Sequence, residues 1–189
     1  RRFSETIMEL SSGELMETFL AFNWNHGYEQ YKERIYNKTA SLFRTAAESG
    51  AVLSGVSEEQ VGALTSYGYN LGMAFQIVDD ILDFQGTEEE IGKPVGHDLL
   101  QGVLTLPALL LLERYPEDNP IISLCRGEEP ELNSKRAVEM VQNSSIIAES
   151  YATAGEFKDE ALRALERLPD TRERRSLLEM AFYVTERRH

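Results

Sequence analysis

The stretch FQIVDDILDF, residues 75–84, places three carboxylates in a segment that is otherwise almost entirely apolar. Residues 71–74, just before it, carry no charge either, and a helix that is apolar nearly all round is buried in a protein or a bundle. Burying one ionised carboxylate costs several kcal/mol unless a cation meets it. Asp79 and Asp83 also lie one helical turn apart, where like charges repel. Because a divalent cation would remove both penalties, this stretch predicts a core helix that carries a metal site.

Helical periodicity divides this segment into two faces. At roughly 100° per residue, alternating spacings of three and four align one apolar stripe: Leu64, Leu71, Phe75, Val78 and Leu82. The same arithmetic places a polar ladder beside that stripe, consisting of Gly72, Gln76, Asp79 and Asp83, with Asp80 further round. The glycine leaves a gap through which another group can approach the helix backbone. We therefore expect the stripe to face the core and the ladder to carry the chemistry.

The ligand types in the ladder indicate which metal it suits. Carboxylate oxygens with no histidine or cysteine nearby favour a hard ion, Mg²⁺ or Mn²⁺. Mg²⁺ usually keeps several waters and shares its coordination shell with substrate phosphates rather than a full protein cage. Asp79, Asp80 and Asp83 are therefore the candidate metal ligands. The simpler alternative is a solvated acidic patch near a helix end, which the apolar surroundings disfavour.

Composition excludes several classes of protein. The chain has 189 residues, of which 42% are hydrophobic, and this suits one core and a single domain over residues 1–189. A net charge of −13 argues against general nucleic-acid binding, which needs a basic surface. No apolar run is long enough to span a bilayer, and no signal-peptide pattern is present. The single cysteine, Cys125, cannot form an internal disulfide, so we expect a cytoplasmic protein.

Every segment long enough to assign reads as helical, and none shows the alternation typical of a strand. Ser57 to Gln60 form a capping box that opens the helix with the aspartates, and Pro107 suits the first turn of a later helix. We expect helices near 4–22, 29–49, 57–84, 107–115, 134–143 and 145–168, with a last one beginning at 170. Loops are expected at 85–102 and from Pro116 through Gly127 and Pro130, where glycine and proline break the periodicity. The prediction is an all-α bundle.

A phosphorylated substrate at such a metal would need cations from the protein as well. Lys38 borders the face of its helix that carries Tyr31, Ile35 and Leu42. Thr39 follows directly and could add a hydroxyl donor to the same phosphate. The alternative for Lys38 is that its charged end simply reaches water along an apolar surface.

A second cation lies in the predicted loop after the aspartates. Lys93 belongs to the segment IGKPVG, residues 91–96. Its proline restricts the backbone, and its two glycines allow conformations that other residues rarely adopt. Such a loop can lay backbone N–H groups and one ammonium over an anion. Asp98 closes the turn, where it is as well placed to cap a following helix as to contact a substrate.

Taken together, these segments resemble the trans-type polyprenyl diphosphate synthases. KTASLF at 38–43 is similar to the family's KTA-x-LF helix, and FQIVDDILD at 75–83 to its second aspartate-rich motif, FQ-x-x-DD-x-x-D. Gly13-Glu14 looks like a short GE element, and GKPVGHDL at 92–99, with the glycine and TLP that follow it, looks like the family's next loop. The ending YVTERR at 183–188 also resembles a family C-terminus.

The resemblance implies a bundle of antiparallel helices of the isoprenoid synthase type, usually dimeric, here without its N-terminal helices. It implies a Mg²⁺-dependent prenyltransferase of isoprenoid biosynthesis, in which an allylic diphosphate loses diphosphate and isopentenyl diphosphate attacks the resulting cation. By matching position, Asp79 is the best metal ligand, followed by Asp83 and Asp80, and Asp79, Asp83 and Lys38 are the catalytic residues. The expected substrate contacts are Lys38, Thr39, Gln76, Lys93 and Asp98.

Two departures from the family pattern limit this expectation. The first aspartate motif, DD-x-x-D, is absent from the chain, and Val103 stands where many short-chain relatives have a lysine. The resemblance implies three Mg²⁺ ions on the diphosphate, and two of them would then lose their main ligands. We therefore expect the isolated chain to be inactive, as the C-terminal part of a synthase or a component that needs another. The alternatives are a non-catalytic or regulatory subunit of a two-component synthase, which has no need of buried carboxylates, and a class I terpene cyclase, which the Lys38-Thr39 pair disfavours.

Overall fold

All regular structure within the described residues, 1–85 and 95–186 of a computed structural model, is helical. The elements are α1 (Arg2–Leu20), α2 (Tyr28–Ile35), the π-helical turn η1 (Tyr36–Ala40), α3 (Ser41–Leu53), α4 (Glu58–Gln85), α6 (His97–Leu100), α7 (Leu106–Arg114), α8 (Pro120–Cys125), α9 (Pro130–Gln142), α10 (Ile146–Leu165) and α11 (Arg172–Glu186). The predicted all-α class is confirmed.

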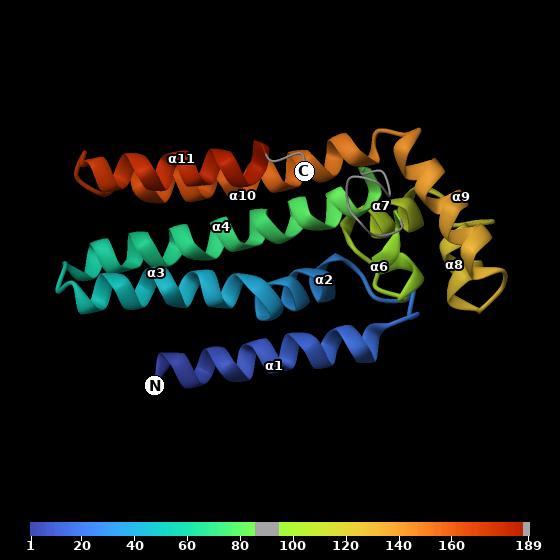
Figure 1. The fold of residues 1–189 in the computed structure, drawn as a ribbon, viewed down its shortest axis with the longest axis horizontal. Coiled ribbons are helices and arrows are strands. Elements are labelled where there is room, and N and C mark those ends of the chain that lie inside the picture. The colour runs from blue at the N-terminus through green and yellow to red at the C-terminus, as the bar shows by residue number, and fades with distance from the viewer. Residues whose placement is uncertain (86–94, 187–189) are drawn as a thin grey trace.

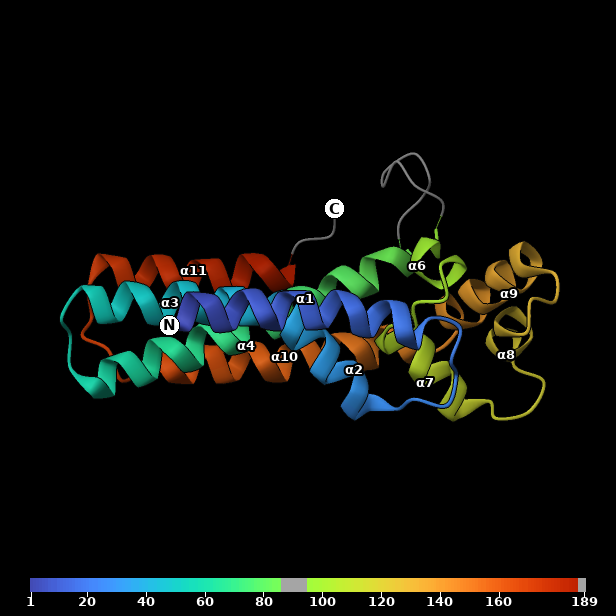
Figure 2. The ribbon, with the colours of Figure 1, turned by 90° about the horizontal axis from the view of Figure 1, so that it is seen from below.

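The long helices lie side by side along the longest axis of the molecule, in the order α1, α2 with α3, α4, and α10 with α11 (Figure 1). The short helices α6 to α9 gather at one end, next to the C-terminal end of α4. Seen from below, α1 runs lengthwise over α3 and η1, which it contacts (Figure 2). Because α4 packs against α3 on one side and α10 on the other, it is the central helix of the fold.

The aspartate-bearing helix begins as the sequence predicts. The backbone N–H of Ser57 donates to Gln60 Oε1 at 3.1 Å, and the N–H of Gln60 donates back to Ser57 Oγ at 3.3 Å. At the other end, the Phe84 carbonyl accepts from Gln142 Nε2 at 2.7 Å, which satisfies one of the terminal carbonyls. Both ends of α4 are therefore fixed by side chains, and its acidic C-terminal turns are held in place.

The predicted core stripe on α4 is only partly the core. Phe75 and Leu82 are half-buried, whereas Val78 of the stripe is fully buried. The rest of the fully buried face consists of Met73, Ala74, Ile77, Ile81 and Phe84. Helical periodicity identifies an apolar face correctly. It does not show on which side of that face the neighbouring helix packs. On α4 that neighbour is α10, and it moves the centre of the core towards Asp80.

Several element boundaries differ from the sequence-based prediction. The helix expected to stop near Gly50 continues to Leu53, because the left-handed position that ends it, with φ of 67°, falls on Gly55 instead. The short helices α6 and α8 lie in segments expected to be loops, and α9 begins at Pro130 rather than Ser134. A helix of one or two turns has too little periodicity to be recognised from sequence.

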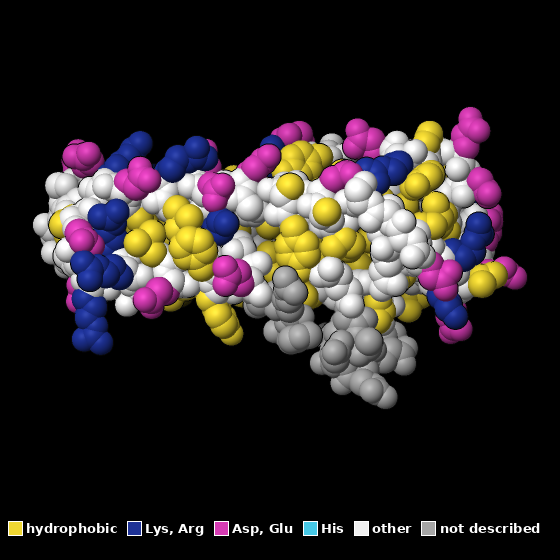
Figure 3. Space-filling view, turned by 90° about the horizontal axis from the view of Figure 1, so that it is seen from above, with side chains coloured by type: hydrophobic (Ala, Val, Ile, Leu, Met, Phe, Trp, Pro, Cys, Tyr) yellow, Lys and Arg dark blue, Asp and Glu magenta, His cyan; other side chains and the backbone are white. Residues whose placement is uncertain are grey.

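The described surface agrees with the composition. On the face that Figure 3 shows, formed largely by α10 and α11, acidic and basic side chains are interspersed with apolar ones rather than gathered into one basic area. Among residues 1–85 and 95–186, no helix combines the length and the apolar character that crossing a bilayer requires.

Candidate active site

The three aspartates of α4 lie in three different environments. The Asp80 side chain is buried, with 2% of the residue exposed, whereas Asp83 is half-buried and Asp79 is exposed. The expectation that Asp80 points away from the ladder is met, but it points inward, next to the core. The acidic trio is therefore divided into one interior carboxylate and two that reach the surface of the helix.

The buried carboxylate of Asp80 is fully engaged by neighbouring side chains. The Tyr31 hydroxyl donates to Oδ2 at 2.7 Å, and Gln76 Nε2 donates to Oδ1 at 2.9 Å. Thr39 Oγ1 then donates to Gln76 Oε1 at 2.6 Å. Burial raises the pKa of Asp80 to about 7, although the hydrogen bonds from Gln76 and Tyr31 and the charge of Arg34 oppose the rise.

The segment that carries Lys38 and Thr39 is a π-helical turn, η1, inserted between α2 and α3. Its extra residue shifts the helical register, which is why Leu42 is 49% exposed although Tyr31 and Ile35 are buried. The predicted face through Tyr31, Ile35 and Leu42 is therefore wrong at its last member. Isolated π turns inside helices are rare and occur frequently at functional sites.

Two glycines allow the neighbouring helices to press against this turn. A Cβ added at Gly13 of α1 would lie 2.4 Å from the Lys38 backbone nitrogen, and one at Gly72 of α4 would lie 2.6 Å from the Ala40 Cα. The gap that the sequence indicates above the aspartates is thus occupied by the chain's own Lys38–Ala40 segment. These contacts fix the position of Lys38 and Thr39 along α4, relative to its acidic end.

Two charged residues that sequence reasoning missed surround Lys38. Its Nζ is 2.6 Å from Glu17 Oε1, and the other oxygen of Glu17 lies 3.6 Å from Arg34 Nη1. Arg34 is buried with 3% exposed, and its Nη2 donates to the Leu104 carbonyl at 2.9 Å. Spacing held a usable signal, because Glu17 lies one turn after Gly13, and Arg34 lies one turn before Lys38.

Asp83 and Asp98 meet at the C-terminal end of α4. The Asp98 backbone N–H donates to Asp83 Oδ2 at 3.2 Å, and the Gly96 N–H donates to the Asp83 carbonyl at 2.8 Å. Burial, followed by the nearby charge of Asp98, raises the pKa of Asp83 to about 7. Asp98 lies inside the first turn of α6, where Gly96 takes the N-cap position, so the alternative role of a side-chain cap is not seen.

These side chains form one electrostatic cluster. The pKa of Asp98 is raised by burial, then by the charges of Glu17 and Asp79, and it is lowered by Lys38. Asp79 likewise contributes to the raised pKa of Asp83. Asp98 therefore lies within electrostatic reach of Lys38, Asp79 and Asp83. Lys93 lies outside the described residues.

The chemistry of this cluster suits a hard divalent cation. Asp79, Asp83 and Asp98 offer oxygen ligands alone, and their mutual repulsion is relieved by a positive charge. Over the described ranges, His, Cys, Asp and Glu side chains do not converge in groups of three or more around one point. A metal here would therefore take its remaining ligands from water or substrate, as Mg²⁺ commonly does.

The raised pKa values predict how the stability of the metal-free protein depends on pH. For Asp83, the stabilising effect of the neutral form is complete below the ordinary pKa near 3.8 and is lost as pH rises through about 7. The melting temperature should therefore fall between pH 5 and pH 8. The Asp83→Asn variant should show a smaller fall, and an equal fall in both proteins would contradict the assignment.

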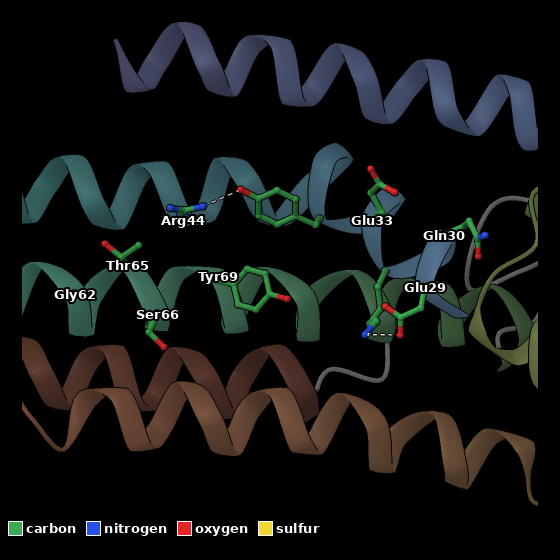
Figure 4. Close-up of a pocket in the computed structure, with 10 residues that line it drawn as sticks. Glu29, Gln30, Glu33, Arg44, Gly62, Thr65, Ser66 and Tyr69 are labelled. Carbon is green, nitrogen blue, oxygen red and sulfur yellow. Dashed lines mark hydrogen bonds and ion pairs between the residues drawn. The ribbon is translucent and has the colours of Figure 1, made fainter. Parts of the chain in front are cut away.

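A groove of about 910 Å³ lies apart from the aspartates, between α2, η1 and α3 on one side and α4 on the other. Figure 4 shows Arg44 directed at the Tyr36 hydroxyl, 3.0 Å away, and the 2.9 Å ion pair of Lys32 with Glu29. The cations lining this groove are thus already paired with protein groups. We therefore place the candidate active site at the acidic end of α4.

Known proteins match most or all of this chain. A family model described as polyprenyl synthetase matches residues 1–148. Heptaprenyl diphosphate synthase component 2 of Bacillus subtilis is 38% identical over 188 residues, which cover 100% of this chain and 54% of that protein. A prenyl transferase of Synechocystis is 38% identical over 186 residues, which cover 98% of this chain and 57% of that protein.

Solved structures show the same relationship. The crystal structure of heptaprenyl diphosphate synthase from Staphylococcus aureus matches with a TM-score of 0.94 and 35% identity, covering 100% of this chain and 59% of that one. A decaprenyl diphosphate synthase from Rhodobacter capsulatus matches with a TM-score of 0.90 and 32% identity, covering 100% and 59%. The chain spans about half the length of the curated relatives it matches.

Proposed function

The chain belongs to the polyprenyl synthetase family, and we propose on that basis that it carries the diphosphate-binding part of a trans-prenyltransferase. The reaction joins an allylic diphosphate to isopentenyl diphosphate. The observation that supports this most directly is that the charges of Lys38 and Asp79, 41 positions apart in sequence, both act on the Asp98 carboxyl. A cation and carboxylates that meet in this way suit a metal-bound diphosphate.

Each residue then has a specific task. Asp79 and Asp83, with Asp98 beside them, would hold Mg²⁺ or Mn²⁺ through carboxylate oxygens. When bound, the metal would supply positive charge that stabilises the departing diphosphate. Lys38 would leave its ion pair with Glu17 and contact a diphosphate oxygen, and Lys93 remains a proposed second contact. Gln76 and Thr39 would line the site, whereas Asp80 would be held away from it by its two hydrogen bonds.

We further propose that this site is incomplete within the chain. The sequence contains no DD-x-x-D motif besides the one at 79–83, and a three-metal mechanism needs carboxylates that face it. The missing carboxylates would come from a preceding segment or from a second subunit. The second source is favoured by relatives named as component 2 of heptaprenyl diphosphate synthase. The assembled protein would be either a homodimer or a complex of two different subunits. Size-exclusion chromatography would distinguish these two assemblies. We propose that the protein acts in the cytoplasm.

A turnover assay tests both proposals. The isolated chain, given an allylic diphosphate, isopentenyl diphosphate and Mg²⁺, should form no prenyl product. The two-motif protein, in which this chain is joined to or paired with a segment carrying DD-x-x-D, should be active. Clear product from the isolated chain would refute its incompleteness. An inactive two-motif protein would refute the prenyltransferase assignment and favour a non-catalytic subunit.

A further inference from the structure

A further pocket lies where the connection between α1 and α2 meets α7 and α10, and the candidate active site uses none of its lining residues. Its volume is about 740 Å³, which is within the range of sites for small organic ligands. The helices that border it, α2, α7 and α10, lie towards the lower edge of Figure 2, whereas α11 lies along the upper edge. Most of the lining is apolar or aromatic: Trp24, Tyr28, Leu106, Leu109, Leu110 and Leu112.

One buried polar side chain, His26, belongs to this apolar lining. Only 8% of the residue is exposed, and its Nδ1 has no hydrogen-bond partner among the described residues. Burial, followed by the charge of Arg34, lowers the pKa of His26, and the Gly27 backbone opposes the change, so the ring is neutral at pH 7. Because a buried polar atom without a partner is costly, a ligand that supplies a hydrogen bond to Nδ1 would gain affinity.

The charges around the pocket disfavour a charged ligand of either sign. Glu113 and Glu156, both exposed, belong to the lining and would repel an anion. The buried guanidinium of Arg34 acts electrostatically on His26 and would repel a cation placed beside that ring. Any ion that entered would also lose its hydration against the apolar wall. The pocket therefore suits an uncharged molecule.

Two cations contact aromatic rings of the lining from outside it. The guanidinium carbon of Arg126 lies 5.6 Å from the centre of the Trp24 ring, and the Lys32 ammonium lies 5.0 Å from the centre of the Tyr28 ring. Lys32 also forms a 2.9 Å ion pair with Glu29. Because these contacts hold both rings in place, this wall of the pocket is formed before any ligand enters.

We propose that this pocket binds an uncharged alcohol with an aliphatic or isoprenoid chain. The chain would cover the leucines and Trp24, and the hydroxyl would form a hydrogen bond with His26 Nδ1. A hydroxyl suits either tautomer of the ring, because it can both donate and accept. The inference does not rest on the proposed function, because the pocket shares no lining residue with the proposed diphosphate site.

Trp24 allows a direct test, because it is the single tryptophan of the chain and belongs to the lining. Titrating the isolated chain with geraniol should change the Trp24 fluorescence in a saturable way, with a Kd of about 1 mM or lower. Geranyl diphosphate, which has the same hydrocarbon chain, should leave the fluorescence unchanged at the same concentrations without Mg²⁺. A response to geraniol that is absent or does not saturate would overturn the proposal, and so would an equal response to geranyl diphosphate.

Substitutions of His26 test the hydrogen bond itself. His26→Phe keeps an aromatic ring but has no hydrogen-bonding atom, so geraniol should bind roughly five- to tenfold more weakly. His26→Asn keeps a polar atom close to the position of Nδ1 and should bind geraniol within about threefold of the wild type. If the phenylalanine variant bound as tightly as the wild type, His26 would have no part in recognition and the proposal would be wrong.

Two matched threonines test the position of the ligand. Thr153 lines this pocket and Thr65 lines the groove beside α3. Both are half-buried, and the hydroxyl of each donates to the backbone carbonyl four residues earlier, at 3.1 Å and 2.7 Å. Thr153→Phe should weaken geraniol binding roughly tenfold or more by filling the pocket, whereas Thr65→Phe should leave it unchanged.

Equal binding by the two threonine variants would overturn the proposal. If Thr153→Phe did not fold, the wild-type titration would still decide the question. Calorimetry should find the same geraniol site in the two-motif protein, again weakened by Thr153→Phe, and its absence there would also contradict the proposal. Failure of the proposed function has a different signature, because the two-motif protein would then have no turnover while geraniol binding persisted.

Discussion

Replacing Asp79 with asparagine should lower the turnover of the two-motif protein by roughly two to three orders of magnitude. The physical reason is that the Asp79 carboxylate reaches the surface of α4 beside Asp83 and Asp98, where a metal would meet the diphosphate. Removing its charge weakens stabilisation of charge that develops in the transition state. Incorporation of labelled isopentenyl diphosphate, measured as kcat/KM, gives the size of the loss.

The same substitution should leave folding almost unchanged, because the side chain is exposed. Asp159→Asn is the matched control, since Asp159 is also an exposed aspartate on a long helix, 3.6 Å from the Lys158 ammonium. Both variants should melt within a degree or two of the wild type, which corresponds to surface effects of about 0.5 kcal/mol. An Asp79→Asn enzyme with more than a tenth of wild-type activity would remove Asp79 from the metal site.

Replacing Gly72 with alanine should cause a large loss of stability. The new Cβ would lie 2.6 Å from the Ala40 Cα and 2.9 Å from the Ala40 Cβ. These atoms belong to the backbone and first side-chain carbon of the neighbouring helix, so they cannot rotate away. We expect a loss of about 3 kcal/mol or more in the free energy of unfolding, measured by urea denaturation.

Gly62 on the same helix supplies a control of opposite sign. Its added Cβ would meet nothing within 4 Å, so Gly62→Ala should stabilise the chain by about 0.5–1 kcal/mol through helix propensity alone. If Gly72→Ala were as stable as Gly62→Ala, the close contact between α4 and η1 would not exist. Thr39 and Lys38 would then lack the support that places them at the aspartates.

The sequence predicts the long helices well because their caps and their periodicity agree. The Ser57 capping box and the apolar run through residue 84 predict the bounds of α4 to within about one residue. The short helices α6 and α8 carry no such redundancy. Their boundaries depend on packing at the end of the bundle, which no local pattern encodes.

The arrangement of the site could be predicted only in part, because it depends on contacts between helices. Angular arithmetic separates Asp80 from Asp79, but the direction in which each points follows from the placement of Tyr31 and α10. The π turn η1 is invisible in sequence, since it is supported by Gly13 and Gly72 from two other helices. Glu17 and Arg34 could not be assigned to the site from the sequence, because charged residues at helical spacing are most often solvated.

We propose that Asp79 and Asp83 bind a divalent ion against a diphosphate while Lys38 neutralises the same anion. Mn²⁺ binding to the isolated chain, followed by electron paramagnetic resonance with and without inorganic pyrophosphate, tests it most directly. We expect about one Mn²⁺ per chain that binds only when pyrophosphate is present, and we expect this binding to be lost in an Asp79→Asn/Asp83→Asn double variant. Binding that ignores pyrophosphate, or that survives in the double variant, would contradict the claim.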